Sequence, residues 1–305
     1  MDLNTQENYI KNDELKIYRG EDFVVSKHII IHQPKLSEIC DYGEREYYQM
    51  IYQLTATPQS MKWQLWDAGT DYTTITAFEL FYKLIYRMFD QEKTSIIFGD
   101  LDLTEFQVGQ KKEDNSICLY QYVYSGDIYK DNELVYQFKT LLDAASFVGC
   151  TYEELFESLN KYNFYEDYVF ANIQPELVMI DEFTYTLITD YLRQVHMILK
   201  DEKMPANETT KMILIEDDKD EYEKNKNKEY HSQLKNMIST MINCEGFKYN
   251  HSQVWDMKIN AFMDSVKRIS KIKNADLLMQ SGYSGFGINL KDIDKKQLDW
   301  LGELE

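Results

Sequence analysis

The chain has 305 residues, a formal net charge of −19 and a pI near 4.7, and it contains only 12 glycines and 4 prolines. An acidic surface repels phosphate, so we expect no binding to nucleic acid and none to an anionic membrane surface. The scarcity of glycine and proline disfavours a loop-rich all-β fold and favours long helices. No apolar run approaches the ~20 residues that a membrane helix needs.

The N-terminal residues and the cysteines indicate a soluble protein inside the cell. The stretch MDLNTQENYIKNDELK is polar and acidic, unlike a secretory signal peptide. The four cysteines lie far apart and form no C-x-x-C pair, which is typical of reduced thiols in the cytosol. They are Cys40, Cys118, Cys150 and Cys244.

The first elements are expected to be a hairpin and a helix. Residues 15–33, LKIYRGEDFVVSKHIIIHQ, predict two strands joined by a turn at residues 19–22. Pro34 suits the start of a helix, and Gly43 interrupts the apolar spacing that follows it. Either a neighbour packs closely at Gly43 or the helix breaks there. His28 and His32 share a face of the predicted strand at about 13 Å, too far apart to chelate one ion.

Two further helices are expected before residue 93. SMKWQLWDAG (60–69) predicts a helix with Trp63 and Trp66 on one face. Thr76-x-x-Glu79 is a capping-box sequence, which predicts that another helix begins there. The apolar side of this helix would comprise Phe78, Phe81, Ile85 and Met88.

Between residues 94 and 138, short β-branched or aromatic runs separated by polar turns predict a small antiparallel sheet. The runs are SIIFGDLDL, FQVGQ, ICLYQYVY and ELVYQF. Thr151-x-x-Glu154 then predicts the capped start of a short helix, TYEELFESLNKY.

Residues 136–160 also have the outline of a helix-turn-helix and resemble the small modules of that kind appended to some homing endonucleases. The second helix would be the recognition helix, yet within the segment 136–160 it contains Glu153, Glu154 and Glu157 and no basic residue. Because phosphate contacts dominate affinity for DNA, such a helix should repel it. A DNA-binding regulator built on this segment remains an alternative function.

The last 125 residues are predicted to be helical. Apolar spacing indicates helices over 181–200 and around 234–242, the latter ending at Gly246. The stretch 216–229, with seven acids against four lysines, predicts a solvated helix face or a linker. The longest helix should run from about residue 254 to 280 with a buried stripe along it. That stripe comprises Trp255, Ile259, Phe262, Val266 and Ile269.

The glycine-rich stretch QSGYSGFGINLKDIDKKQLDW (280–300) is not expected to hold phosphate. Its G-x-x-G-x-G order differs from the dinucleotide fingerprint, and a helix precedes the glycines. We expect Gly282 to end that helix in the left-handed conformation. Asp100-x-Asp102 and Asp217-Asp218 supply hard oxygen ligands without a recognisable metal loop. A metal-dependent nuclease that uses such carboxylates is therefore an alternative without positive support.

Together these elements predict an α+β protein that is predominantly α-helical. It would have an N-terminal β-hairpin, a small central antiparallel sheet and a C-terminal helical unit. The expected ranges are 1–92 for the hairpin and its helices, 93–180 for the sheet with a helical insertion, and 181–305 for a helical domain with a docking tail.

Three stretches resemble a family of tailed-phage and prophage proteins encoded among tail morphogenesis genes. They are VWDMKINAF, INLKDIDKKQLDWLGEL and the earlier LSEICDYGEREYYQMIYQLTATPQSMKWQLWDAG. The resemblance covers most of 25–120 and 180–305, whereas 125–180 looks like a variable insertion. Members are often regarded as tail-assembly chaperones, so the resemblance implies an assembly or virion-associated role in the host cytoplasm or the particle. It supplies no catalytic residues.

We therefore expect a non-enzymatic protein, without cofactor or metal, that binds other phage structural or tail proteins; a homo-oligomer is compatible with this role. Aromatic and Met-rich surfaces would hold aggregation-prone segments, while the net charge of −19 would supply solubility. The candidate aromatic contacts are Trp63, Trp66, Trp255, Phe262, Tyr283 and Trp300. A basic patch, KRISKIK, adds Lys267, Arg268 and Lys271 as candidates for gripping an acidic partner. The competing interpretation is burial in the chain's own core for the aromatics and a solvated helix end for the patch.

Overall fold

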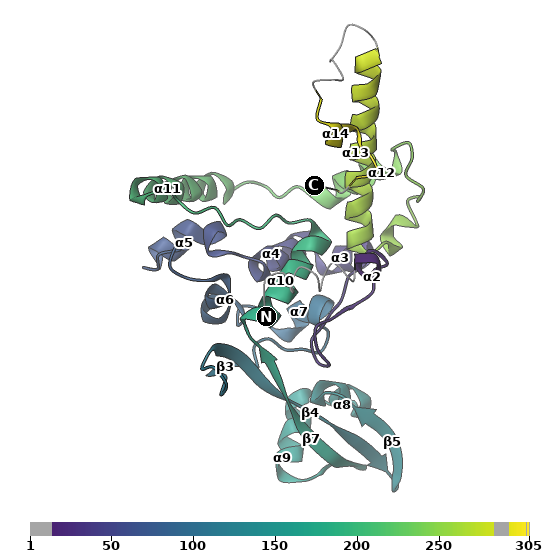
Figure 1. Cartoon of the computed structure of the whole chain (residues 1–305). Coiled ribbons are helices and arrows are strands. Elements are labelled where there is room, and N and C mark those ends of the chain that lie inside the picture. The colour runs from purple at the N-terminus through teal and green to yellow at the C-terminus, as the bar shows by residue number, and fades with distance from the viewer. Residues whose placement is uncertain (1–13, 284–292, 303, 305) are drawn as a thin grey trace. The chain divides into compact units, whose positions relative to one another are not determined.

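The computed structural model describes residues 14–283, 293–302 and 304. This part of the chain is α+β and predominantly helical, with an N-terminal two-stranded hairpin and a five-stranded antiparallel sheet, which confirms the predicted fold class (Figure 1). Packing divides the chain into two units. Unit 1 comprises the described parts of Met1–Phe23, His32–Thr76 and Thr189–Glu305, and unit 2 comprises Val24–Ile31 and Ala77–Ile188. The three consecutive ranges expected from the sequence remain a prediction.

The N-terminal hairpin forms, but its turn comes later in the chain than predicted. Helix α2 (Glu14–Tyr18) occupies the place of the expected first strand. Gly20, with a φ of 77°, donates its N–H to the Ile17 carbonyl and so ends this helix. A left-handed glycine closes a helix as readily as it turns a hairpin, which explains the error. The strands are β1 (Phe23–Val24) and β2 (Ile30–Ile31), joined by residues 25–29.

The helix expected after Pro34 breaks at Gly43 into α3 (Leu36–Tyr42) and α4 (Glu44–Leu54). Gly43 has φ 104° and ψ 113°, a conformation open to glycine and strained for other residues. Its N–H donates to the Ile39 carbonyl and its own carbonyl accepts from the Tyr47 N–H, so one residue ends a helix and begins the next.

Further helices complete the first part of unit 1, and α10 runs from unit 2 into it. The turn η1 (Pro58–Met61) leads into α5 (Lys62–Asp67), as the sequence predicted. Helix α10 (Glu182–His196) lies within the predicted range 181–200. Helix α11 (Glu208–Asn225) contains most of the charged stretch, whose side chains are largely exposed, as expected for a solvated helix face.

A buried polar network joins α4 to the C-terminal end of α10. The Nδ1–H of His196 donates to the Leu192 carbonyl (2.7 Å), so the neutral ring can accept the Tyr47 hydroxyl proton at Nε2 (2.6 Å). Burial lowers the pKa of His196 to about 4, which keeps the ring neutral at physiological pH. Beside it, the buried Arg193 donates to the Thr55 carbonyl (2.6 Å).

The C-terminal part of unit 1 holds α12 (Gln233–Ile242), η3 (Val254–Asp256), α13 (Ile259–Tyr283) and α14 (Lys295–Leu298). Helix α12 ends before Gly246, so that predicted end was four residues too late. Helix α13 continues through Gly282, so Gly282 does not end it, and Gly285 and Gly287 lie outside the described residues.

The predicted buried stripe of α13 holds only in its first turns. Ile259 and Phe262 are fully buried, whereas Val266 and Ile269 are half-buried. The periodicity indicated the correct face, but the complete burial of the predicted stripe is limited to Ile259 and Phe262; further along α13, Ala275 is also buried. Helix α14 packs on α13 further along.

The main part of unit 2 begins with α6 (Ala77–Leu80), the π-helical turn η2 (Phe81–Ile85) and α7 (Gln91–Phe98). The prediction of a strand over the run SIIFGDLDL is wrong, because the first four residues of this run form the end of α7. The Asp90 side chain caps this helix by accepting from the Lys93 N–H (3.0 Å), a local signal that outweighs the β-branched run. Met88 was expected on the apolar side and is instead exposed.

The five-stranded sheet comprises β3 (Gln107–Gln110), β4 (Ile117–Lys130), β5 (Glu133–Phe138), β6 (Phe164–Tyr165) and β7 (Tyr168–Ile180). Its order is β3-β4-β7-β6, and β5 pairs with the far end of β4. Three of these strands match the predicted runs, whereas β7, the main partner of β4, was not predicted. All the pairings are antiparallel.

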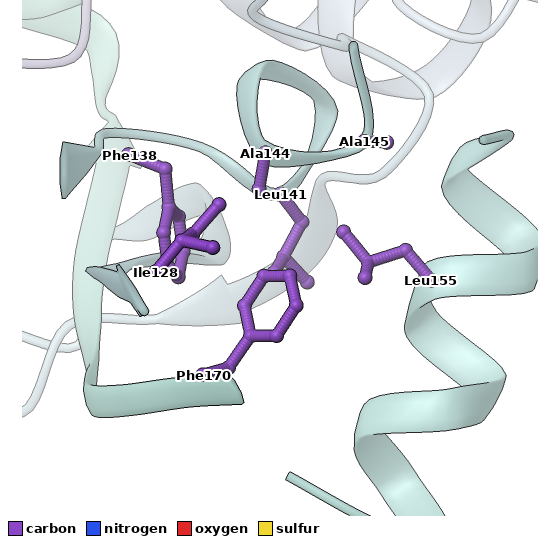
Figure 2. Packing of buried hydrophobic residues seen from close by; sticks show 7 residues of the cluster. All are labelled: Ile128, Phe138, Leu141, Ala144, Ala145, Leu155 and Phe170. Carbon is purple, nitrogen blue, oxygen red and sulfur yellow. The ribbon is translucent and has the colours of Figure 1, made fainter. Parts of the chain in front are cut away.

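Two helices pack against one end of this sheet, α8 (Leu141–Val148) and α9 (Tyr152–Lys161). The predicted capping box at Thr151 and Glu154 is present. Figure 2 shows the small core that results, in which side chains of α8 and α9 meet those of the strands. Its buried members are Ile128, Phe138, Leu141, Ala144, Ala145, Leu155 and Phe170.

Candidate protein-binding face

The sheet of unit 2 has an exposed aromatic surface on β4 and β7. Tyr120 pairs with Met179, Tyr122 with Leu177 and Tyr124 with Pro175, so these side chains share one face of the sheet. Tyr122, Leu177 and Met179 are 56%, 49% and 42% exposed. We call this surface the aromatic face and define it by Tyr120, Tyr122, Tyr124, Leu177 and Met179.

Near Tyr120 and Tyr122, the other face of the same strands is mostly buried. Leu119, Val178 and Ile180 alternate with the exposed residues and are almost inaccessible to solvent. Antiparallel sheets commonly have one packed face and one solvated face, and the solvated face is then usually polar. Here it carries tyrosine, leucine and methionine, which makes it a candidate binding surface.

The helices cover only one end of this sheet face. Ile128 lies on the same side of β4 as Tyr124, and it is buried by α8 and α9. The half of β4 that pairs with β3, together with the part of β7 beside it, extends beyond these helices (Figure 1). The aromatic face is therefore on the same side of the sheet as the small core, in the part that α8 and α9 do not cover.

The aromatic face continues onto the first turn of α9. Tyr124 and Tyr152 both pack against the small core, and the Tyr152 ring stacks on Phe156 at 5.8 Å between centroids. On the strands, the Tyr120 and Tyr122 rings meet edge to face at 6.5 Å. Several rings are thus held in place by contact with one another or with the core.

Tyr120 is positioned by its neighbour on β3. A Cβ on Gly109 would lie 2.6 Å from the ring of Tyr120, so the ring lies directly over the glycine backbone. The Tyr120 hydroxyl donates to the Gln107 side-chain oxygen (3.3 Å). A larger residue at 109 would displace the ring, so the glycine helps to shape the face.

Carboxylates border the aromatic face near Tyr152. Burial is the largest cause of the raised pKa of Tyr152, and Glu105, Asp102 and Glu153 raise it further by their negative charge. Glu105 and Glu153 are exposed. Among the described residues, neither the Glu105 nor the Glu153 carboxylate has a hydrogen-bond or ion-pair partner. The local field at this end of the face is therefore negative.

The candidate residues Trp63 and Trp66 lie elsewhere, on α5 in unit 1. The Trp63 ring contacts the Tyr222 ring of α11 at 4.9 Å, and the Trp63 backbone N–H donates to Asp218 (3.2 Å). Lys211 lies over the Trp66 ring at 5.7 Å. Both tryptophans thus contribute to the packing of α5 against α11, although Trp66 is also partly exposed.

The Lys211 ammonium group makes the charged contacts of this α5–α11 junction. It donates to Asp71 and to Glu208, each at 2.8 Å. The hydrogen bond from Lys211 is the largest cause that lowers the pKa of Asp71, to about 2.

The remaining aromatic candidates are spread along the C-terminal part of unit 1. Phe262 is buried in α13, Trp255 is half-buried beside His251, and Tyr283 and Trp300 are exposed. Because Phe262 is buried, these four residues do not form one exposed surface, and none of them belongs to the aromatic face.

The basic candidates lie on α13 and all three have partners within the chain. Arg268 donates to the carbonyls of Trp300 and Gly302, each at 2.8 Å. Lys267 and Lys271 are half-buried and also have partners. Arg268 therefore bonds described residues of the C-terminal segment to α13.

The two histidines of the N-terminal segment, His28 and His32, each contact a carboxylate. His28 contacts Glu176 (2.7 Å), whose pKa is lowered to about 2, first by the hydrogen bond from Lys27 and then by that from His28. His32 pairs with Asp22 (2.9 Å). Over residues 14–283, 293–302 and 304, no three His, Cys, Asp or Glu side chains are grouped so as to hold a metal ion.

The helix-turn-helix outline corresponds to α8 and α9, joined through Gly149 in the left-handed conformation. Leu155 of α9 points into the small core, while Glu153, Glu154 and Glu157 are exposed. The face that α9 offers to a ligand is therefore acidic, as the sequence predicted.

Sequence reasoning missed the aromatic face, although part of the signal was present. The run ICLYQYVY places tyrosine at every second residue from 120 to 124, which is the period of one strand face. The other half of the face lies on β7, within a range that was interpreted as a variable insertion. Without β7, the exposure of Leu177 and Met179 could not be foreseen.

Residues 224–305 match the family model described as YomV second domain, and YomV is a phage-type protein. The match begins at the end of α11 and covers α12, η3, α13 and α14, less than half of the chain. This segment is thus similar to a domain of phage type, which agrees with the phage family that the sequence resembles. Comparisons with curated proteins and with solved structures gave no match. None of the described helices is long and apolar enough to cross a membrane.

Proposed function

We propose that this chain is a phage protein that binds other phage structural or tail proteins, in tail assembly or as a component of the virion. The observation that carries the proposal is the aromatic face, with Tyr122, Leu177 and Met179 exposed side by side, while Leu119, Val178 and Ile180 on the opposite face are buried. The phage-type match over residues 224–305 supports the phage context.

The composition of the aromatic face suits protein binding. Tyrosine and methionine are enriched at protein interfaces, because they bury a large area and tolerate partners of different shape. The surrounding chain is strongly acidic, which keeps such a surface soluble when it is free. The role proposed for this face needs no bond to be made or broken, so we propose no catalytic activity.

Site-specific photo-crosslinking tests the proposal. The photoreactive residue benzoyl-phenylalanine replaces Tyr122 in one variant and Tyr52, an exposed tyrosine of α4 in unit 1, in a control. In cells that produce the phage, we expect position 122 to crosslink a phage structural or tail protein and position 52 not to do so. Crosslinks that are absent from position 122, or identical from both positions, would contradict the proposal.

The two alternative functions have their own tests. A metal-dependent nuclease would bind Mg²⁺ specifically in calorimetry, and we expect no such binding. A DNA-binding regulator would shift duplex DNA in a gel at low salt, where phosphate contacts are strongest. We expect no shift, because α9 exposes three carboxylates. A tight complex in either experiment would overturn the proposed function.

A further inference from the structure

We propose that the segment that binds the aromatic face is cationic, an extended arginine- or lysine-bearing stretch of another phage protein. This inference rests on the proposed function and adds the chemistry of the partner. It follows from three features of the face, namely its exposed rings, its carboxylate border and the apolar residues beside the rings.

The rings of the aromatic face are arranged to receive cations. Tyr122 is exposed beside Tyr120, and Tyr152 and Phe156 form a second pair on α9. The face of an aromatic ring is electronegative and attracts an ammonium or guanidinium group within about 6 Å of its centre. Since Gly109 and Gln107 hold the Tyr120 ring in place, part of this surface is formed before a ligand binds.

The charges near the rings favour the same partner. Glu105 and Glu153 are exposed; Glu153 follows Tyr152 directly on α9, and Glu105 lies two residues before Gln107, which pairs with Tyr120. No cation among the described residues is paired with Glu105 or Glu153. A cationic partner would therefore supply the charge that this end of the face lacks.

The apolar residues suit long basic side chains. The methylene stems of arginine and lysine pack on apolar surface while their charged ends remain near water or carboxylates. Leu177 and Met179 offer such surface next to Tyr122 and Tyr120. Arginine fits better than lysine, because its planar group stacks on a ring and bonds a carboxylate at two positions.

Other occupants are less favoured by the same features. A second copy of this chain carries the same net charge of −19, so the approach of two acidic surfaces is repelled. A neutral strand could pair with the outer edge of β7, where among the described residues β6 bonds only at Tyr168 and Val169. Such pairing would leave the carboxylates without a partner.

Fluorescence anisotropy with synthetic peptides tests the inference on the full chain. The probe is a labelled ten-residue peptide of alternating arginine and serine, and the matched control replaces every arginine with the neutral isostere citrulline. We expect the arginine peptide to bind at least about tenfold more tightly, and its affinity to fall by about tenfold from low salt to about 0.3 M NaCl.

Matched variants locate the binding. Tyr122→Leu removes the ring and should weaken binding of the arginine peptide at least about fivefold, whereas Tyr122→Phe keeps the ring and should change it less than about twofold. Glu105→Gln removes one border charge and should weaken binding about threefold. Tyr249→Leu, at an exposed tyrosine of unit 1, should have no effect. Equal circular dichroism spectra would show that each variant is folded.

Several outcomes would overturn the inference. Equal affinity for the arginine and citrulline peptides would show that the face selects apolar or backbone groups. Unchanged affinity in Tyr122→Leu would show that cations bind elsewhere on the acidic surface. A dimer that forms in the wild type and is lost in Tyr122→Leu would identify a second copy as the occupant.

The inference and the proposed function fail separately. A phage structural protein crosslinked at position 122, together with equal binding of both peptides, would leave the function standing and refute the cationic partner. Selective arginine binding without a crosslink to a phage protein would support the cationic preference of the aromatic face and refute the proposed function.

Discussion

Tyr47 in unit 1 and Tyr122 in unit 2 are the same residue type in opposite surroundings. Tyr47 is fully buried on α4, and its hydroxyl is bonded to the equally buried His196. Tyr122 lies on β4 with more than half of its surface exposed. The 24 tyrosines of this chain therefore do not form one class, and their abundance alone predicts neither a core nor an interface. What separates the two is whether another element covers the face on which the tyrosine lies.

Replacing each of the two tyrosines with alanine should give the largest difference in the free energy of unfolding. Replacing a fully buried aromatic ring with alanine commonly costs about 3–5 kcal/mol, and Tyr47→Ala also leaves Nε2 of His196 without its donor. We expect Tyr47→Ala to lower the free energy of unfolding by about 4 kcal/mol. Tyr122→Ala should change it by less than about 0.5 kcal/mol. Urea unfolding of both variants measures this, and similar losses would mean that Tyr122 is part of a core.

The pH dependence of stability should depend on the buried histidine. Folding lowers the pKa of His196 from its usual value near 6.5 to about 4, so between these values the unfolded chain binds the extra proton. Stability is then complete above about pH 6.5 and falls as the pH drops towards 4. Two and a half pKa units correspond to about 3 kcal/mol.

The His196→Asn variant is the control for this effect. It does not titrate, so its stability should change less than that of the wild type between pH 7 and pH 4. The pKa values of Asp71 and Glu176 are also lowered, to about 2 each, but they affect stability mainly below pH 4.5 and equally in both proteins. Parallel pH profiles from urea unfolding would mean that His196 is not kept neutral by burial.

The sequence predicted elements well where a local signal and the apolar spacing agreed. The capped helix after Thr151, the apolar face of α10 and the alternating strand β4 all formed as expected. It failed where two local signals competed. Gly20 ends a helix instead of turning a hairpin, and Asp90 starts a helix in a run rich in isoleucine. In both places a single backbone-capping residue decided the structure.

The candidate site was harder to predict, because exposure is a tertiary property. The stripe from Ile259 to Ile269 has the correct helical period, yet Val266 and Ile269 are only half-buried, unlike Ile259 and Phe262. Tyr122 carries the period of a strand face, yet nothing in the local sequence tells that α8 and α9 stop short of it. Periodicity indicates which residues share a face, and only the fold determines whether that face is covered.

The smallest expected effect concerns Arg268, and it tests whether this residue is bonded to the chain itself or free to bind a partner. The sequence offered it as a contact for an acidic partner, but its guanidinium group donates to the carbonyls of Trp300 and Gly302. Arg268→Gln should therefore weaken the attachment of residues 293–302 to α13 by about 1 kcal/mol, with little effect on global unfolding. The matched control is Lys273→Gln, an exposed residue of the same helix.

Limited chymotrypsin digestion measures this attachment, since Trp300 and Leu301 are cleavable residues within the attached segment. A loss of about 1 kcal/mol raises the population of the opened tail about fivefold, and cleavage at these residues should accelerate by the same factor. Lys273→Gln should be cleaved at the wild-type rate. If Arg268→Gln is also cleaved at that rate, its two hydrogen bonds do not hold the tail, and Arg268 would again be a cation available to a partner, as the sequence first suggested.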